Sequence, residues 1–177
     1  MSVNWDDYNP YEPPYYGPLA ELSRAEARES FNQLMSAKSE RIDMLRALLK
    51  ANGLPLSGDD DSVQRLAEWL RSEVEANPEH PERLRNIWYA VVNDVALFLG
   101  ETLINRCPGL RWEMFTAGRR DVAYQKHVIT GFRKVANPKY NLDIDRLVAT
   151  YLHQVISGKP TDPSYFVNVL EAAAAKV

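Results

Sequence analysis

Apolar residues recur along most of the chain at spacings of three and four, with polar residues between them. This period places apolar side chains on one face of an α-helix, so it predicts amphipathic helices packed around a common core. Segments rich in glycine, proline and asparagine separate the stretches and favour turns. The pattern allows the first predicted helix to break at residues 36–39. The predicted helices cover about residues 23–53, 59–77, 84–107, 143–157 and 162–177.

Residues that favour helix N-termini precede most of these stretches. Ser23 and Glu26 have the spacing of a capping box, in which each side chain bonds the other residue's backbone N–H. Residues 59–62 offer N-cap chemistry to the second helix, and Asp143 occupies the expected N-cap position of the fourth. Asp162 is followed by a proline suited to the first turn of the last helix. These signals predict where the helices begin.

The third stretch is the most apolar, and its apolar positions cover more than one face. We therefore expect this helix to be buried at the centre of the fold. Gly100 lies inside it, where glycine costs about 1 kcal/mol relative to alanine. Close packing of another element against Gly100 would compensate for this cost. Pro108 and Gly109 end the helix.

Residues 110–115 change to the alternating pattern of a β-strand. A turn is predicted at Ala117-Gly118 and a second strand over residues 122–129, and an extended segment at residues 132–135 would continue the sheet. The predicted fold class is therefore α+β. It is a mainly helical single domain with a small antiparallel sheet, a hairpin at about residues 110–130, packed on the long central helix.

Residues 1–18 differ in composition from the rest of the chain, because tyrosines and a tryptophan alternate with prolines. Proline blocks helix formation and favours extended chain. We interpret this segment as an extended arm, followed by one domain over residues 19–177. Its aromatic content is higher than that of disordered tails. The arm is expected to pack along its own domain, or alternatively along a partner.

Composition excludes several classes of protein. The 177 residues are 45% apolar and 25% charged, which is typical of a globular protein. The formal charge of −3 gives no field that concentrates nucleic acid, and no apolar run reaches the roughly 18 residues that span a bilayer. Cys107 is the single cysteine, and the N-terminal residues lack the features of a signal peptide. These features predict a cytoplasmic location, with neither nucleic acid nor membrane as a partner.

A cluster of polar and aromatic residues near the predicted hairpin is the best candidate for chemistry. Glu101, Trp112, Tyr124 and His127 would line a pocket beside the central helix. In an enzyme, Glu101 or Glu113 would act as general base and His127 as acid. The favoured alternative is structural, with Trp112 in the core, Glu101 paired locally and His127 on a solvated face of the sheet. The sequence therefore favours a non-enzymatic protein over an enzyme.

Other polar residues suggest binding and not catalysis. Arg119 and Arg120, at the hairpin tip, together with Tyr15 and Tyr16 in the arm, are candidate anchors for a partner. None of the three histidines has the spacing of a zinc ligand, and the acidic residues 59–61 are better explained by the helix dipole that follows them. We therefore expect neither a metal nor a cofactor.

Leu99-Gly100-Glu101-Thr102-Leu103 followed by Gly109-Leu110-Arg111-Trp112 resembles a loose pattern in uncharacterised bacterial cytosolic families, some of them immunity-type proteins encoded beside secreted toxins. Residues 62–70 resemble the helix that precedes that unit. The resemblance covers about 50 residues and brings no catalytic residues with it. It implies a non-enzymatic protein-binding module, of which the most concrete version is an immunity-type protein that neutralises a toxin. The alternatives are a small-ligand-binding domain or enzyme with a pocket beside the central helix, and a regulatory or structural homo-oligomer built on the alanine-rich last helix.

Overall fold

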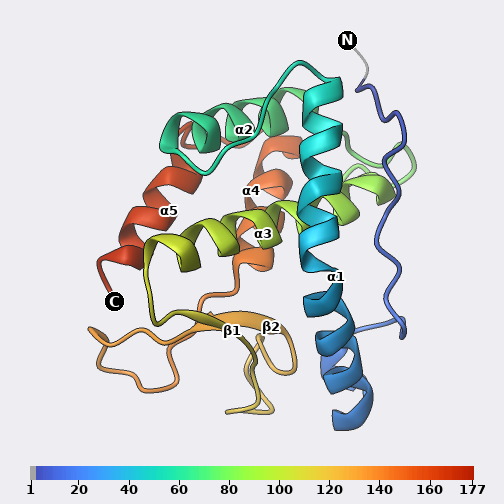
Figure 1. Cartoon of the computed structure of the whole chain (residues 1–177). Coiled ribbons are helices and arrows are strands. Elements are labelled where there is room, and N and C mark those ends of the chain that lie inside the picture. The colour runs from blue at the N-terminus through green and yellow to red at the C-terminus, as the bar shows by residue number, and fades with distance from the viewer. Residues whose placement is uncertain (1–2) are drawn as a thin grey trace.

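The computed structural model describes residues 3–177; the first two residues of the predicted arm lie outside them. Over these residues the chain forms five α-helices and one two-stranded antiparallel sheet (Figure 1). The predicted fold class, a mainly helical α+β chain, is confirmed. The elements are α1 (Arg24–Ala51), α2 (Asp60–Glu73), α3 (Asn86–Arg106), β1 (Arg111–Met114), β2 (His127–Thr130), α4 (Ile144–Ile156) and α5 (Tyr165–Ala174), with a short 3₁₀ turn at Leu19–Glu21 before α1.

The helix starts follow the capping signals in three of four cases. Ser23 forms both halves of the capping box with Glu26, while Asp59 and Asp143 accept bonds from the backbone N–H groups three residues ahead. The prediction for Asp162 is wrong. Helix α5 begins at Tyr165, and Asp162 instead accepts bonds from the Ser164 backbone N–H and the Asn168 side chain, which fixes the preceding turn.

Helix α1 continues without a break through residues 36–39. The Ser36 hydroxyl donates to the Asn32 carbonyl one turn back, so it bonds within the helix rather than competing with it. The break allowed by the sequence does not occur. The result is one helix of 28 residues, which passes the other helices and extends to the region beside the hairpin (Figure 1).

Helix α3 lies at the centre of the fold, as its apolar pattern predicts. It packs against α1, α4 and α5, and its buried residues include Trp88, Leu97 and Leu103. By length and mean hydropathy, α3 is also the one helix among residues 3–177 that would reach across a bilayer, in contrast to the expectation from sequence. Two thirds of its apolar window, however, is buried inside this fold. The same composition is found in core helices.

The hairpin is shorter than predicted. Trp112 pairs with Ile129 and Met114 with His127, and the second strand begins at His127 rather than at residue 122. Residues 115–126, which we call the tip loop, fold into successive turns because Asp121 accepts from the backbone N–H of Ala123 and Gln125 adopts a positive φ of 63°. The tight turn predicted at Ala117-Gly118 is therefore replaced by a longer, structured loop.

Residues 132–135 do not extend the sheet as predicted. The backbone N–H groups of Arg133 and Lys134 both donate to the carbonyl of Lys176, near the C-terminus. Ile129 forms its second backbone pairing with Leu142 instead. The C-terminal residues are thus hydrogen-bonded to the segment that follows β2. Helix α5 packs its apolar face on α2 and α3 of its own chain through residues such as Phe166 and Leu170.

The arm, residues 3–18, runs antiparallel to α1 along most of the length of that helix (Figure 1). Asn4 exchanges two hydrogen bonds with Asn52 at the end of α1. The Asn9 carbonyl accepts from Arg41 in the middle, and the Tyr15 hydroxyl donates to Glu29 in the second turn. The described part of the arm therefore packs on its own domain.

Candidate functional site

A cavity of about 420 Å³ lies between the arm, the first half of α1, the first half of α3 and the end of the tip loop. Both helices present a stripe of residues to it at the same spacing of i, i+3, i+4 and i+7, which is one face of a helix. These stripes are Ala27, Ser30, Phe31 and Leu34 on α1, and Asn86, Tyr89, Ala90 and Asn93 on α3. The volume is within the range of small-molecule sites in proteins. We call this space the arm cavity.

Arm residues 10–17 form the outer wall of the arm cavity. Among the bonds of the described residues, the only one that holds these residues to the domain is from Tyr15 to Glu29. The arm is fixed much more firmly on either side of this segment. The outer wall is therefore a short length of chain held between two anchors.

The first anchor is a buried polar triad. The Tyr8 hydroxyl donates to Asp94 Oδ2 at 2.7 Å, and Arg41 forms two bonds with the same carboxylate, at 3.0 Å and 2.6 Å. Burial, reinforced by the charge of Asp94, raises the pKa of the Tyr8 phenol, so this hydroxyl remains a donor. Arg41 also donates to the Asn9 carbonyl at 2.7 Å. The presence of the acidic Asp94 in the apolar helix α3 is thus explained by its bond to Tyr8, through which it holds the arm.

The second anchor is Gln125, a buried side chain from the tip loop. Its Nε2 donates to the carbonyls of Leu19 and Leu22, at 2.6 Å and 3.0 Å. The positive φ of Gln125 turns this side chain toward the start of α1. The conformation of the tip loop and the position of the arm are therefore linked through one residue.

The described wall of the arm cavity is aromatic and has no acidic or basic side chain other than His127. Its described lining residues include no Asp, Glu, Lys or Arg. Five of them are aromatic side chains other than histidine: Tyr11, Tyr15, Tyr16, Phe31 and Tyr89. Tyr16 and Tyr89 are 77% and 43% exposed, the only large aromatic side chains so exposed over residues 3–177, so they mark the mouth of the cavity. Large exposed aromatics beside a cavity are typical of a binding site.

Three residues of this wall carry buried polar atoms that lack a hydrogen-bond partner. They are the Tyr11 hydroxyl, the Ser30 hydroxyl and His127 Nε2. Most buried polar atoms in proteins are paired, because leaving one unpaired costs about 1–3 kcal/mol. Only two further atoms of this kind occur in the described chain, on Trp88 and Tyr151. Unsatisfied hydrogen-bonding capacity is thus concentrated at the arm cavity.

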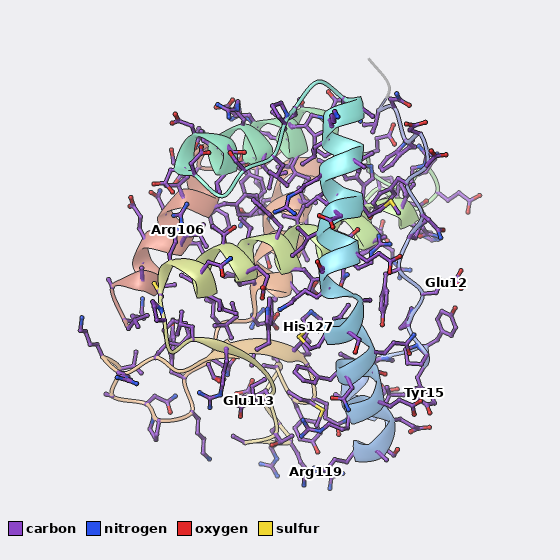
Figure 2. All side chains as sticks on the ribbon, in the orientation of Figure 1. Glu12, Tyr15, Arg106, Glu113, Arg119 and His127 are labelled. Carbon is purple, nitrogen blue, oxygen red and sulfur yellow. The ribbon has the colours of Figure 1, made fainter. Side chains whose placement is uncertain are left out.

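His127 lies between the hairpin and α1, as Figure 2 shows, on the sheet face that carries Trp112. The rings of His127 and Trp112 are 6.0 Å apart. Trp112 Nε1 donates to Glu101 at 2.8 Å, and Lys38 donates to the same carboxylate oxygen at 2.6 Å. Glu101 thus pairs with α1 and the sheet rather than locally. His127 faces the interior, so its expected place on a solvated face is wrong.

The predicted pocket set is therefore only partly brought together. Of its four members only His127 lines the arm cavity. Glu101 and Trp112 are outside its lining, and Glu101 accepts from both Trp112 and Lys38. Tyr124 belongs to the tip loop, where its described hydrogen bond is a backbone bond to Asp121.

The carboxylate near His127 is not the one that the sequence hypothesis proposed as general base. Glu113 points away from α3, is exposed, and accepts from Arg111 and Thr130. Asp145, at the start of α4, is a carboxylate that the sequence did not single out. Burial raises the pKa of Asp145, and the nearby charge of His127 acts in the opposite direction. No hydrogen bond joins the two side chains among the bonds of the described residues.

The predicted partner-binding residues fall in two different places. Tyr15 and Tyr16 line the arm cavity. Arg119 and Arg120 are exposed in the tip loop and are not among the residues that line the arm cavity. Within residues 3–177, neither arginine takes part in an ion pair. Only the two tyrosines therefore belong to the arm cavity.

The sequence did not identify Ser30, Asn86, Tyr89 or Asn93 as site residues, although the spacing was visible. Polar and small residues recur at these positions on one face of each helix, where a core face would be apolar. No group of three or more potential metal ligands comes together within the described part of the chain.

Comparison of the chain with protein-family models, with curated proteins and with solved structures finds no match.

Proposed function

We propose that this protein binds a small molecule in the arm cavity. The observation that carries the proposal is the coincidence of an aromatic cavity with three buried, unpartnered polar atoms in its wall. Binding sites for small molecules are mostly apolar and hold a few converging polar groups that orient the ligand. A ligand would supply partners for Tyr11, Ser30 and His127. The proposed function therefore corresponds to one of the alternatives that the sequence left open, a small-ligand-binding domain.

Ser30 offers a test in which stability and binding change in opposite directions. Ser30→Ala removes an unpaired buried hydroxyl and improves helix propensity, so we expect the free energy of unfolding to rise by about 1 kcal/mol. The same change removes a ligand contact, so affinity should fall about tenfold. Urea unfolding and a binding titration measure the two effects.

Ser36→Ala is the matched control, because Ser36 lies on the same helix, is exposed and already bonds the Asn32 carbonyl. It should leave affinity unchanged. If Ser30→Ala lowers stability instead, the Ser30 hydroxyl has a partner in solution and no longer supports the proposal.

The occupant can be sought directly. The purified protein is incubated with a small-molecule extract of its native host, washed, and denatured, and the released compounds are identified by mass spectrometry. Wild-type protein is expected to release a compound at close to one per chain. Ala90→Phe fills the space between α1 and α3 and should release none. Tyr16→Ala, at the exposed mouth, cannot disturb the core and should release less than wild type.

Ala172→Phe is the control for adding a phenyl ring, since Ala172 is exposed on α5, outside the arm cavity. It should release as much compound as wild type. Equal release from wild type and Ala90→Phe, or none from either, would refute the proposal.

A protein-binding function, the first expectation from the sequence, is the second candidate. It is supported by the tip loop, where exposed Arg119 and Arg120 precede Val122, an apolar side chain that is 62% exposed. Arginine beside exposed apolar surface is typical of interface anchors. A secreted toxin is the partner that the immunity-type resemblance proposes.

This second candidate predicts that Arg119→Ala/Arg120→Ala lowers affinity for a co-purifying protein at least tenfold. The matched control is Arg24→Ala/Arg28→Ala on the exposed side of α1, which should not change that affinity. Undiminished binding by the tip-loop variant would rule out this surface.

A further inference from the structure

We infer that the ligand of the arm cavity is an electrically neutral molecule built on flat rings, with one or two hydrogen-bonding groups. This inference rests on the proposed function, since it names the chemical class that the site would take. It follows from three properties of the wall: its lack of acidic, lysine and arginine side chains, its aromatic content and its unpartnered polar atoms.

A charged ligand finds no carboxylate, ammonium or guanidinium group among the described residues that line the arm cavity, where His127 is the one side chain that can carry a charge. Two of the ion pairs around the cavity are already complete, Arg41 with Asp94 and Lys38 with Glu101. The carboxylate of Glu29 accepts from Tyr15. Burying an unpaired charge is strongly unfavourable, because its hydration is lost without compensation. A neutral ligand avoids that cost.

The aromatic side chains favour rings. Tyr11 lines the cavity from the arm and Phe31 from α1, and the exposed side chains of Tyr16 and Tyr89 mark its mouth. Aromatic side chains give large contact areas and pair well with other rings in offset or edge-to-face arrangements. A flexible aliphatic chain would gain only the area it buries. The wall is therefore better matched to a planar molecule.

Apart from His127, the polar side chains of the wall are neutral donors or acceptors. Asn86 and Asn93 present amides from α3, and Ser30 presents a hydroxyl from α1. A tyrosine or serine hydroxyl both donates and accepts, and an amide does the same through separate atoms. A ligand with a hydroxyl, amide or ring N–H would satisfy these groups without carrying a charge.

Two dyes that share a skeleton and differ in charge test the inference. N-phenyl-1-naphthylamine is neutral, and 8-anilinonaphthalene-1-sulfonate adds one sulfonate to the same rings. Fluorescence titrations of the full chain are done at about pH 8, above the ordinary pKa of an imidazole. We expect the neutral dye to bind at least tenfold more tightly than the sulfonate. Ala90→Phe should weaken binding of the neutral dye at least tenfold, and Ala172→Phe should not.

The outcomes separate this inference from the proposed function. If the sulfonate binds as tightly as the neutral dye and Ala90→Phe weakens both, the cavity is a binding site but the ligand class is wrong. Displacement of the neutral dye by tetramethylammonium at millimolar concentration would likewise overturn the class in favour of a cation held by aromatic rings. If neither dye binds, or if Ala90→Phe changes nothing, the proposed site itself fails.

Discussion

Replacing Asp94 by alanine is expected to lower the free energy of unfolding by about 3–5 kcal/mol, because it leaves a buried guanidinium without its counter-charge. Arg41 and Asp94 are both buried, and the Tyr8 hydroxyl would lose its acceptor as well. Urea unfolding followed by circular dichroism measures the loss. The arm should also detach, since Tyr8 is its main buried contact. Limited proteolysis should then cut within residues 9–18 in the variant and not in the wild type.

A triple variant separates the charge effect from packing. Tyr8→Phe/Arg41→Met/Asp94→Leu removes every member of the triad together and replaces it with apolar groups. Buried ion pairs replaced in this way often lose little stability. We therefore expect the triple variant to recover most of the loss caused by Asp94→Ala. A single Asp94→Ala variant within 1 kcal/mol of wild type would contradict the role given to the triad.

Replacing Gly100 by alanine is expected to destabilise the protein by about 2 kcal/mol, although alanine is the better helix former. A Cβ at position 100 would stand 2.5 Å from Trp112 Cη2 and closer still to Cζ2. The Trp112 ring would have to move, and its bond to Glu101 would be lost. The packing expected at Gly100 from the sequence is therefore provided by a side chain of β1. Thermal and urea unfolding measure the change.

The sign of the effect should reverse when Trp112 is removed. In a Trp112→Ala background, Gly100→Ala should raise stability by about 1 kcal/mol, because only the helix-propensity gain remains. Gly58→Ala is the control, since a Cβ there would meet nothing closer than 3.8 Å and the residue has no positive φ. If Gly100→Ala is destabilising in both backgrounds by the same amount, Trp112 is not the cause.

Much of the fold could be predicted because its signals are local. A capping box such as that of Ser23 and Glu26 needs only residues three apart, and the apolar period of α3 needs only one helix. The sequence predicts that the hairpin exists but not how long its strands are. Its second strand was shortened by the turns around Asp121 and by the positive φ of Gln125, and Gln125 is held there by carbonyls about 100 residues earlier. Sequence patterns do not contain such distant contacts.

The site was only partly predictable for the same reason. Residue type alone makes Tyr15, Tyr16 and His127 candidates, and all three line the arm cavity. Ser30 and Asn93 cannot be found in this way, because a serine or an asparagine on a helix face indicates a site only when another element lies opposite it. That element is the arm, and its position depends on Asp94, which in the sequence is one polar residue within an apolar helix.

These contacts give the arm two roles, one in stability and one in binding. Its first half contributes Tyr8 to the buried triad, and its second half supplies the outer wall of the arm cavity. Loss of the Tyr8 contact should therefore open the outer wall of the arm cavity. We therefore expect Asp94→Ala to weaken binding of N-phenyl-1-naphthylamine even under conditions where the domain remains folded.

Amide chemical shifts test whether this protein binds its ligand in the arm cavity. The protein labelled with nitrogen-15 is titrated with N-phenyl-1-naphthylamine, and the shifted amides are mapped on the structure. We expect saturable shifts concentrated in residues 10–19, 27–34, 86–93 and 125–127. Shifts centred on the outer tip loop or on α5, or no saturable shift at all, would show that the ligand does not bind in the arm cavity.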